Sequence, residues 1–217
     1  MILNLGCGSQ VVDGWVNVDY ALGARLAKLP LFRVVNSKLR LFRLNWDPRI
    51  YIHDLTKPFP WPDGSAEAIY SSHTLEHLTK DEGYRFLSEC HRVLREHGII
   101  RIVVPDLRHI VRKYLDGHIV ADDFVESLGV LYARSGGRVR RTLATFLQFP
   151  HKCMYDNERL LKILDETGFV ASRRASFDSD IPNIHLVELE SRTRNAVVVE
   201  GRKKAVRPFR QLSINCS

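Results

Sequence analysis

The sequence has no run of about 18 apolar residues, so no segment of it is expected to cross a bilayer as a helix. Residues 1–4 lack the basic region of a signal peptide, and we expect no secretory leader. Internal repeats and low-complexity tracts are also missing. Cysteine is scarce, and the spacing of the four residues fits neither a zinc knuckle nor a redox pair. Reduced thiols in a cytoplasmic protein are the simplest interpretation of Cys7, Cys90, Cys153 and Cys216.

The chain is nevertheless long and apolar enough for a complete α/β domain. It has 217 residues, of which 45% are hydrophobic, and this composition is typical of a globular protein with a full core. We predict a single domain over residues 1–205 that carries insertions at about 21–50 and 118–154. Residues 206–217 are predicted to be a flexible tail.

Positive charge exceeds negative charge. The formal net charge is +7 and the pI is about 9.4, which favours anionic partners such as phosphate-bearing substrates, nucleic acid or acidic lipid. Seven Lys or Arg residues lie in the segment 25–49 against one acid, Asp47, and Leu and Phe are interleaved with them. A solvated lid is the favoured interpretation of this segment. Peripheral contact with an anionic membrane surface comes second, and nucleic-acid binding third, since no known RNA or DNA module is present.

Strand and helix patterns alternate along the chain. Apolar runs predict strands, and a capping box at Thr79 and Glu82 predicts the start of a helix that ends at Gly98. Asp156 is expected to cap another helix, which Gly168 ends, and residues 118–150 are expected to be mostly helical. Such alternation indicates a doubly wound, mostly parallel sheet. The predicted strands are residues 2–6, 15–19, 50–55, 68–72, 99–104, 170–177 and 195–203.

A glycine turn follows the first strand, and an acid ends the second. Gly6-Cys7-Gly8 leaves room for a ligand beside the backbone, and Asp19 can accept hydrogen bonds from both hydroxyls of a ribose. A nicotinamide dehydrogenase is disfavoured, because its fingerprint needs glycine at the position of Val11 and an acid about 20 residues onward. Here the acid follows Gly8 by 11 residues, so the first crossover has room for a turn or two of helix at most.

The predicted third strand also ends in an acid, Asp54. Taken singly, Asp19 and Asp54 could be ordinary turn or cap residues. At the ends of adjacent strands beside a glycine turn they favour an adenosine site, with Asp19 at the ribose and Asp54 near the exocyclic amine of the base.

At this point the sequence resembles the class I S-adenosylmethionine-dependent methyltransferases, and most closely their type 11 group, which is often found with glycan synthesis. The resemblance runs from about residue 2 to 110 and resumes at 155–169 and in the last strand pair. The stretches that carry it are residues 4–8, 17–19, 53–55, 70–77, 92–98 and 103–106. It implies a seven-stranded sheet whose last strand is antiparallel, and S-adenosyl-L-methionine as the cofactor.

The resemblance also implies which residues surround the cofactor. The glycine turn would lie beside the methionine part, and the end of the fourth strand would border the sulfonium and the methyl acceptor. The implied cofactor-binding residues are Asn4, Gly6, Cys7, Gly8, Asp19, Tyr20, Asp54, Leu55, Ser71, Ser72 and His73. Two positions depart from the family pattern: many members have an acid where this chain has Asn4, and a third glycine where it has Gln10.

Methyl transfer to oxygen needs a proton acceptor, and histidine is the side chain that titrates nearest neutrality. His73, His77 and His151 are the candidate catalytic residues. Each has a structural alternative: a cap at the strand–helix turn, a partly exposed helix residue, or simple packing. A metal on His73, Glu76 and His77 is disfavoured, because the chain lacks the His-Glu-x-x-His arrangement.

The predicted function is transfer of a methyl group from S-adenosylmethionine to an oxygen or nitrogen of a small molecule or glycan. A nucleic-acid methyltransferase is the alternative, although residues 71–73 lack the Asn/Asp-Pro-Pro-Tyr element common among enzymes that methylate nucleobase amines. A non-catalytic cofactor-binding module is the third hypothesis. We expect a cytoplasmic protein, with peripheral membrane contact through 25–49 as a further possibility; the sequence assigns no oligomeric state.

Overall fold

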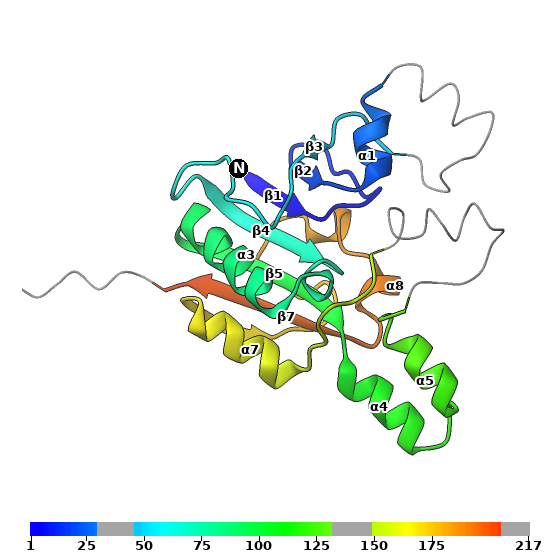
Figure 1. The fold of residues 1–217 in the computed structure, drawn as a ribbon. Coiled ribbons are helices and arrows are strands. Elements are labelled where there is room, and N and C mark those ends of the chain that lie inside the picture. Colours follow the sequence, from blue (N-terminus) through cyan, green and yellow to red (C-terminus); the bar gives the residue numbers. More distant parts are fainter. Residues whose placement is uncertain (30–45, 132–148, 205–217) are drawn as a thin grey trace, which may run out of the picture.

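The computed structural model describes residues 1–29, 46–131 and 149–204. These residues form a seven-stranded sheet with the order β3-β2-β1-β4-β5-β7-β6 (Figure 1). Neighbouring strands are parallel except at β7, which is antiparallel to both β5 and β6. The predicted doubly wound α/β class with an antiparallel last strand is therefore confirmed. The strands are β1 (Ile2–Leu5), β2 (Val16–Asp19), β3 (Tyr51–Ile52), β4 (Ala66–Ser72), β5 (Leu94–Pro105), β6 (Phe169–Arg173) and β7 (Ala196–Lys203).

Two long helices, α3 (Lys80–Val93) and α7 (Asn157–Glu166), cover one face of the sheet (Figure 1). The predicted caps are present in both: Thr79 and Glu82 form a capping box, and the Asp156 side chain accepts a hydrogen bond from the Arg159 backbone N–H. Each helix buries one apolar stripe against the central strands, which is the main source of helix stability in a globular domain. The stripe residues are Phe86, Leu87, Cys90, Val93, Leu160, Ile163 and Leu164.

The opposite face of the sheet is covered by the segment 174–195. It contains the short helices η2 (Ile184–Leu186) and α8 (Glu190–Thr193), which the sequence patterns did not predict. Its apolar side chains pack on Tyr70 and Val103 of the central strands. This segment connects β6 to β7, so the part of the chain that covers this face is the connection within the last strand pair.

A buried arginine fastens that segment to the sheet. Arg101 of β5 is fully buried, and its five N–H groups have five acceptors. Glu188 takes two of these hydrogen bonds, at 2.7 and 2.9 Å, and Glu200 of β7 takes one at 3.2 Å. The backbone carbonyl oxygens of Asp178 and Ala175 take the other two, at 2.7 and 2.9 Å. One cation thus joins β5, β7 and the covering segment.

Some predicted boundaries are wrong. The helix expected to reach Gly98 ends at Val93, because Leu94 already has extended backbone angles and pairs with Ala66 of β4. The register then shifts between Ala66 and Ala68, so residues 95–98 form an irregular start of β5. The strand expected at 170–177 ends at Arg173. The one expected at 50–55 is reduced to Tyr51–Ile52, which leaves Asp54 in the loop after it.

The predicted insertions are described only in part. Within 21–50 the structure contains α1 (Leu22–Ala27), and within 118–154 it contains α5 (Ala121–Ser127), which follows α4 (Leu107–Leu115). Residues 30–45, 132–148 and 205–217 lie outside the described residues, and so do most of the basic lid and the predicted tail. Among the cysteines, Cys7, Cys90 and Cys153 are free thiols.

Candidate functional site

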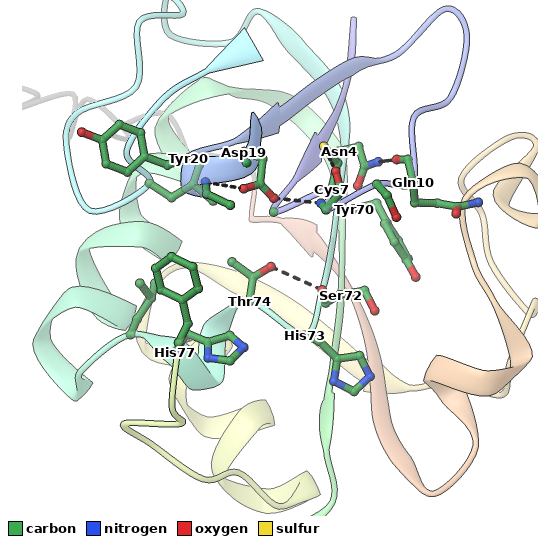
Figure 2. A pocket seen from close by; sticks show the side chains of 18 of the residues that line it. Asn4, Cys7, Gln10, Asp19, Tyr20, Tyr70, Ser72, His73, Thr74 and His77 are labelled. Carbon is green, nitrogen blue, oxygen red and sulfur yellow. Dashed lines mark hydrogen bonds between the residues drawn. The ribbon is translucent and has the colours of Figure 1, made fainter. Parts of the chain in front are cut away.

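A cavity of about 640 Å³ lies at the carboxyl ends of the parallel strands β1, β2 and β4. This edge of an α/β sheet is where ligands usually bind. Its volume is in the range of small-molecule sites. Figure 2 shows Asn4 and Asp19 along one side of the cavity and His73 and His77 along the other, with Thr74 between them.

The turn between β1 and β2 forms the floor of the cavity. Gly6 and Gly8 have φ angles of 75° and 56°, in the left-handed region that favours glycine. The backbone N–H groups of Gly6 and Cys7 both donate to the Val18 carbonyl oxygen, at 2.9 and 3.0 Å. These bonds extend the β1–β2 pairing into the turn, and residues 6–15 contain no helix.

The two glycines differ in what surrounds them. A Cβ on Gly6 would lie 2.0 Å from Oγ1 of Thr74, whereas a Cβ on Gly8 would have no neighbour within 4 Å. Gly6 thus allows close packing of the turn against the residue that follows β4. Gly8 keeps a side of the cavity clear.

Asp19 links this turn to the next loop. Its Oδ2 accepts a hydrogen bond from the Gly8 backbone N–H at 2.8 Å, and its Oδ1 accepts one from the Ala21 N–H at 2.7 Å (Figure 2). Both oxygens are fixed by backbone donors, and a carboxylate oxygen has capacity for a second hydrogen bond. Asp19 lines the cavity, so this remaining capacity is available to a ligand.

Asn4 is committed to a network of amides. Its Nδ2 donates to the Gln10 carbonyl oxygen at 2.9 Å and to Oδ1 of Asn17 at 3.1 Å. Asn17 in turn exchanges hydrogen bonds with the backbone N–H and carbonyl of Val12. The network holds the loop after the glycine turn, and Asn4 is only 2% exposed although it borders the cavity.

Tyr20, Asp54 and Leu55 also line the cavity. Oδ1 of Asp54 accepts hydrogen bonds from the backbone N–H and the hydroxyl of Thr56, at 3.0 and 2.7 Å. This turn fixes the carboxylate after β3. Asp19 and Asp54 thus share one cavity, as the adenosine hypothesis requires, and their contact with a cofactor stays a prediction.

Ser71 and Ser72, at the end of β4, face different surroundings. Ser72 lines the cavity, whereas Ser71 is 1% exposed, is not part of the lining, and donates its hydroxyl to the Leu5 carbonyl at 3.0 Å. Neighbouring residues of a strand point to opposite faces, so both could not face the ligand.

His73 has a strained backbone, with φ at 52°. Its Nδ1 lies 3.1 Å from Oε1 of Glu76, and its Nε2 lies 2.9 Å from the Arg192 carbonyl oxygen. The ring lines the cavity and is held from both sides. Residues with strained angles cluster at functional sites, and this one stands where a sheet strand meets the cavity.

His77 and His151 lie against each other, with ring centroids 5.0 Å apart. His77 lines the cavity, and burial lowers its pKa. His151 is not part of the lining; its Nδ1 lies 2.7 Å from the Leu128 carbonyl oxygen. The three histidines proposed from sequence therefore gather at one end, but His151 lies behind His77.

The sequence analysis missed several parts of the wall. Trp46 and α1 close one side of the cavity, and the segment 187–192 closes another. No motif marks these residues, because their position depends on pairings between distant strands. The lining residues not predicted include Gln10, Trp46, Phe149, Lys152, Val187, Leu189 and Arg192.

The two glycines should respond differently to alanine. We expect Gly6→Ala to lower the melting temperature strongly, because its Cβ meets Thr74 at 2.0 Å and the left-handed angle costs about 1–2 kcal/mol more. Gly8→Ala should lower the stability only by that backbone cost, so the fold should be kept. It should nevertheless weaken cofactor binding. Thermal unfolding with and without cofactor measures both effects; equal melting temperatures for the two variants would contradict this account.

The fold and the cavity define a class of protein, an α/β domain with a cavity of small-molecule size at the ends of its parallel strands. Residues 3–102, from β1 into β5, match the model of the methyltransferase domain family. This match supports a class I S-adenosylmethionine-dependent methyltransferase of the type 11-like group, an enzyme with S-adenosylmethionine as its cofactor.

Several solved structures are similar to this chain at low sequence identity. A S-adenosylmethionine-dependent methyltransferase from Methanosarcina mazei is 16% identical, with 95% of this chain and 92% of that chain covered and a TM-score of 0.50. The putative methyltransferase solved with the Trm112 activator from Haloferax volcanii is 13% identical, with 94% and 82% covered and a TM-score of 0.48. One from Archaeoglobus fulgidus is 16% identical, with 93% and 85% covered and a TM-score of 0.47. A search of curated proteins found no match.

None of the helices within residues 1–29, 46–131 and 149–204 is long and apolar enough to span a bilayer.

Proposed function

We propose that this enzyme moves the methyl group of S-adenosylmethionine to an oxygen or nitrogen of a small molecule or glycan. The observation that carries the proposal is the continuity of the cavity. It runs from the glycine turn and Asp19 to His73 and His77, so donor and acceptor can meet inside it.

The residues present fit the cofactor. The side of Gly8 that a Cβ would occupy is open, and both oxygens of Asp19 are oriented by backbone donors. Asp19 would hold the ribose, and Asp54 with Leu55 would lie by the adenine. Tyr20 and the backbone of Gly6 and Cys7 would complete the contacts predicted from the family resemblance.

The bound cofactor supplies an activated methyl group, so the chain need only align the acceptor, exclude water and receive a proton. His73 and His77 line the cavity and are the candidates for the proton acceptor. Burial and the charge of Asp19 raise the pKa of Cys7 to about 12. Its thiol therefore stays protonated and does not compete as a nucleophile.

The wall around the acceptor end is mixed in character. Lys152 and Arg192 contribute positive charge, while Phe149 and Leu189 contribute apolar surface. This combination suits a small polar molecule or sugar. An RNA acceptor is less favoured, because residues 71–73 carry no element for a nucleobase amine. Cytoplasmic location and membrane contact through 25–49 remain part of the proposal.

The test combines binding and turnover. S-adenosylmethionine at 100 times its dissociation constant should stabilise the protein by about 2.7 kcal/mol, which raises the melting temperature by about 5–10 °C. Transfer of a labelled methyl group is then assayed against sugars, small amines, phenols and RNA. Labelling of a sugar or small molecule supports the proposal, and labelling of RNA alone contradicts it.

A further inference from the structure

We infer that Glu76, His77 and His151 form a binding site for a divalent transition metal at the wall of the cavity. One carboxylate oxygen of Glu76 and one ring nitrogen from each histidine lie within 4.8 Å of one another. The trio differs from the one weighed on sequence, because His151 replaces His73. The inference concerns a site separate from the cofactor contacts.

Glu76 supplies a buried carboxylate. The residue is 1% exposed and sits in η1 (Leu75–His77) directly after β4. Its Oε1 pairs with Nδ1 of His73, whereas its Oε2 is buried and has no hydrogen-bond partner among the described residues. A buried carboxylate oxygen without a partner is costly, and a metal ion would satisfy it.

Both histidines direct their Nδ1 atoms at backbone carbonyl oxygens. Nδ1 of His151 lies 2.7 Å from the Leu128 oxygen, and Nδ1 of His77 lies 3.5 Å from the Pro150 oxygen. A histidine that donates from Nδ1 keeps its lone pair on Nε2. Metal-binding histidines usually have this arrangement, with the other ring N–H held by a carbonyl or carboxylate.

The backbone holds the two segments together. The N–H groups of Lys152 and Cys153 both donate to the Glu76 carbonyl oxygen, at 2.8 and 3.1 Å, and His151 N–H donates to the Gly129 oxygen at 2.9 Å. A Cβ on Gly129 would lie 2.7 Å from the His151 ring. The His151 ring therefore packs against residue 129, where a side chain would collide with it.

Two imidazoles and one carboxylate suit zinc or another divalent first-row metal, and zinc sites with three protein ligands keep a fourth position open. Ligand atoms around zinc are roughly 3.3 Å apart, given bonds of about 2.0–2.1 Å. Small side-chain rotations would bring these three together. His77 lines the cavity, so the metal site would adjoin it. His77 would then act as a ligand and would no longer be a candidate proton acceptor.

The experiment uses tag-free full-length protein that has been treated with a chelator. Co²⁺ is added without S-adenosylmethionine, and its visible absorption is followed; Zn²⁺ is then added in competition. We expect one Co²⁺ to bind per chain and Zn²⁺ to displace it. His77→Gln and His151→Gln should each weaken binding at least tenfold, and His118→Gln, at an exposed histidine of the described residues, should leave it unchanged.

Gly129→Ala is the second variant, because it displaces the His151 ring and removes no ligand atom. It should also weaken Co²⁺ binding, while circular dichroism and the cofactor-induced shift in melting temperature report that the fold is kept. Absence of Co²⁺ binding, or equal binding by His77→Gln and His118→Gln, would overturn the inference. Either result would leave the methyl-transfer proposal intact, since that is tested by cofactor binding and turnover.

Discussion

Replacing Asp19 with alanine should remove at least half of the rise in melting temperature that S-adenosylmethionine produces at 100 times its dissociation constant. The carboxylate is held by the N–H groups of Gly8 and Ala21 and is proposed to accept hydrogen bonds from the ribose. Hydrogen bonds to a charged group contribute about 1.5–3 kcal/mol each. The loss of one or two of them weakens binding by roughly 10- to 10,000-fold. Isothermal titration with the demethylated cofactor measures the change.

Asp13→Ala is the matched control, because Asp13 is an exposed carboxylate that pairs with Arg49 and does not line the cavity. It should bind the cofactor as the parent protein does. Asp19→Ala also removes two acceptors from the backbone, so the melting temperature without cofactor must be recorded for both variants. Undiminished affinity in a folded Asp19→Ala protein would refute the proposed ribose contact.

Replacing Arg101 with methionine should lower the free energy of unfolding by about 3–5 kcal/mol, the usual cost of removing one partner from a buried ionic cluster. Glu188 and Glu200 would remain buried, with side-chain exposures of 0% and 3%, and would face no cation. Urea unfolding monitored by circular dichroism gives the value.

Arg194→Met provides the comparison. Arg194 pairs with Glu190 on the surface, where both side chains are about 70% exposed, and such pairs contribute at most about 1 kcal/mol. The loss of Arg101 should also disturb the acceptor end of the cavity, because Glu188 lies between Val187 and Leu189 of the cavity wall. Equal stabilities of the two variants would contradict the role given to Arg101.

The parts of the fold and site that local chemistry determines could be predicted from sequence. The glycine turn, Asp19 at the next strand end and the Thr79 capping box each depend on a few adjacent residues. The cap at Asp156 is of the same kind. Their positions along the chain were therefore correct.

Features that depend on distant pairings were not predicted. The irregular start of β5 follows from the pairing of Leu94 with Ala66, which no local pattern records. Only the observed sheet shows that Ser71 faces the Leu5 carbonyl and not the cavity. The contact of His151 with His77 likewise requires segments more than 70 residues apart to meet.

The amide pair of Asn4 and Asn17 has a consequence for attempts to redesign this protein by family consensus. Many relatives have an acid where this chain has Asn4, and a designer would be inclined to restore it. Here an aspartate would bring carboxylate oxygens against two other acceptors, the Gln10 carbonyl and Oδ1 of Asn17, which would both lose the donor that Asn4 supplies. Positions 4 and 17 must therefore be exchanged together, along with the loop that they support.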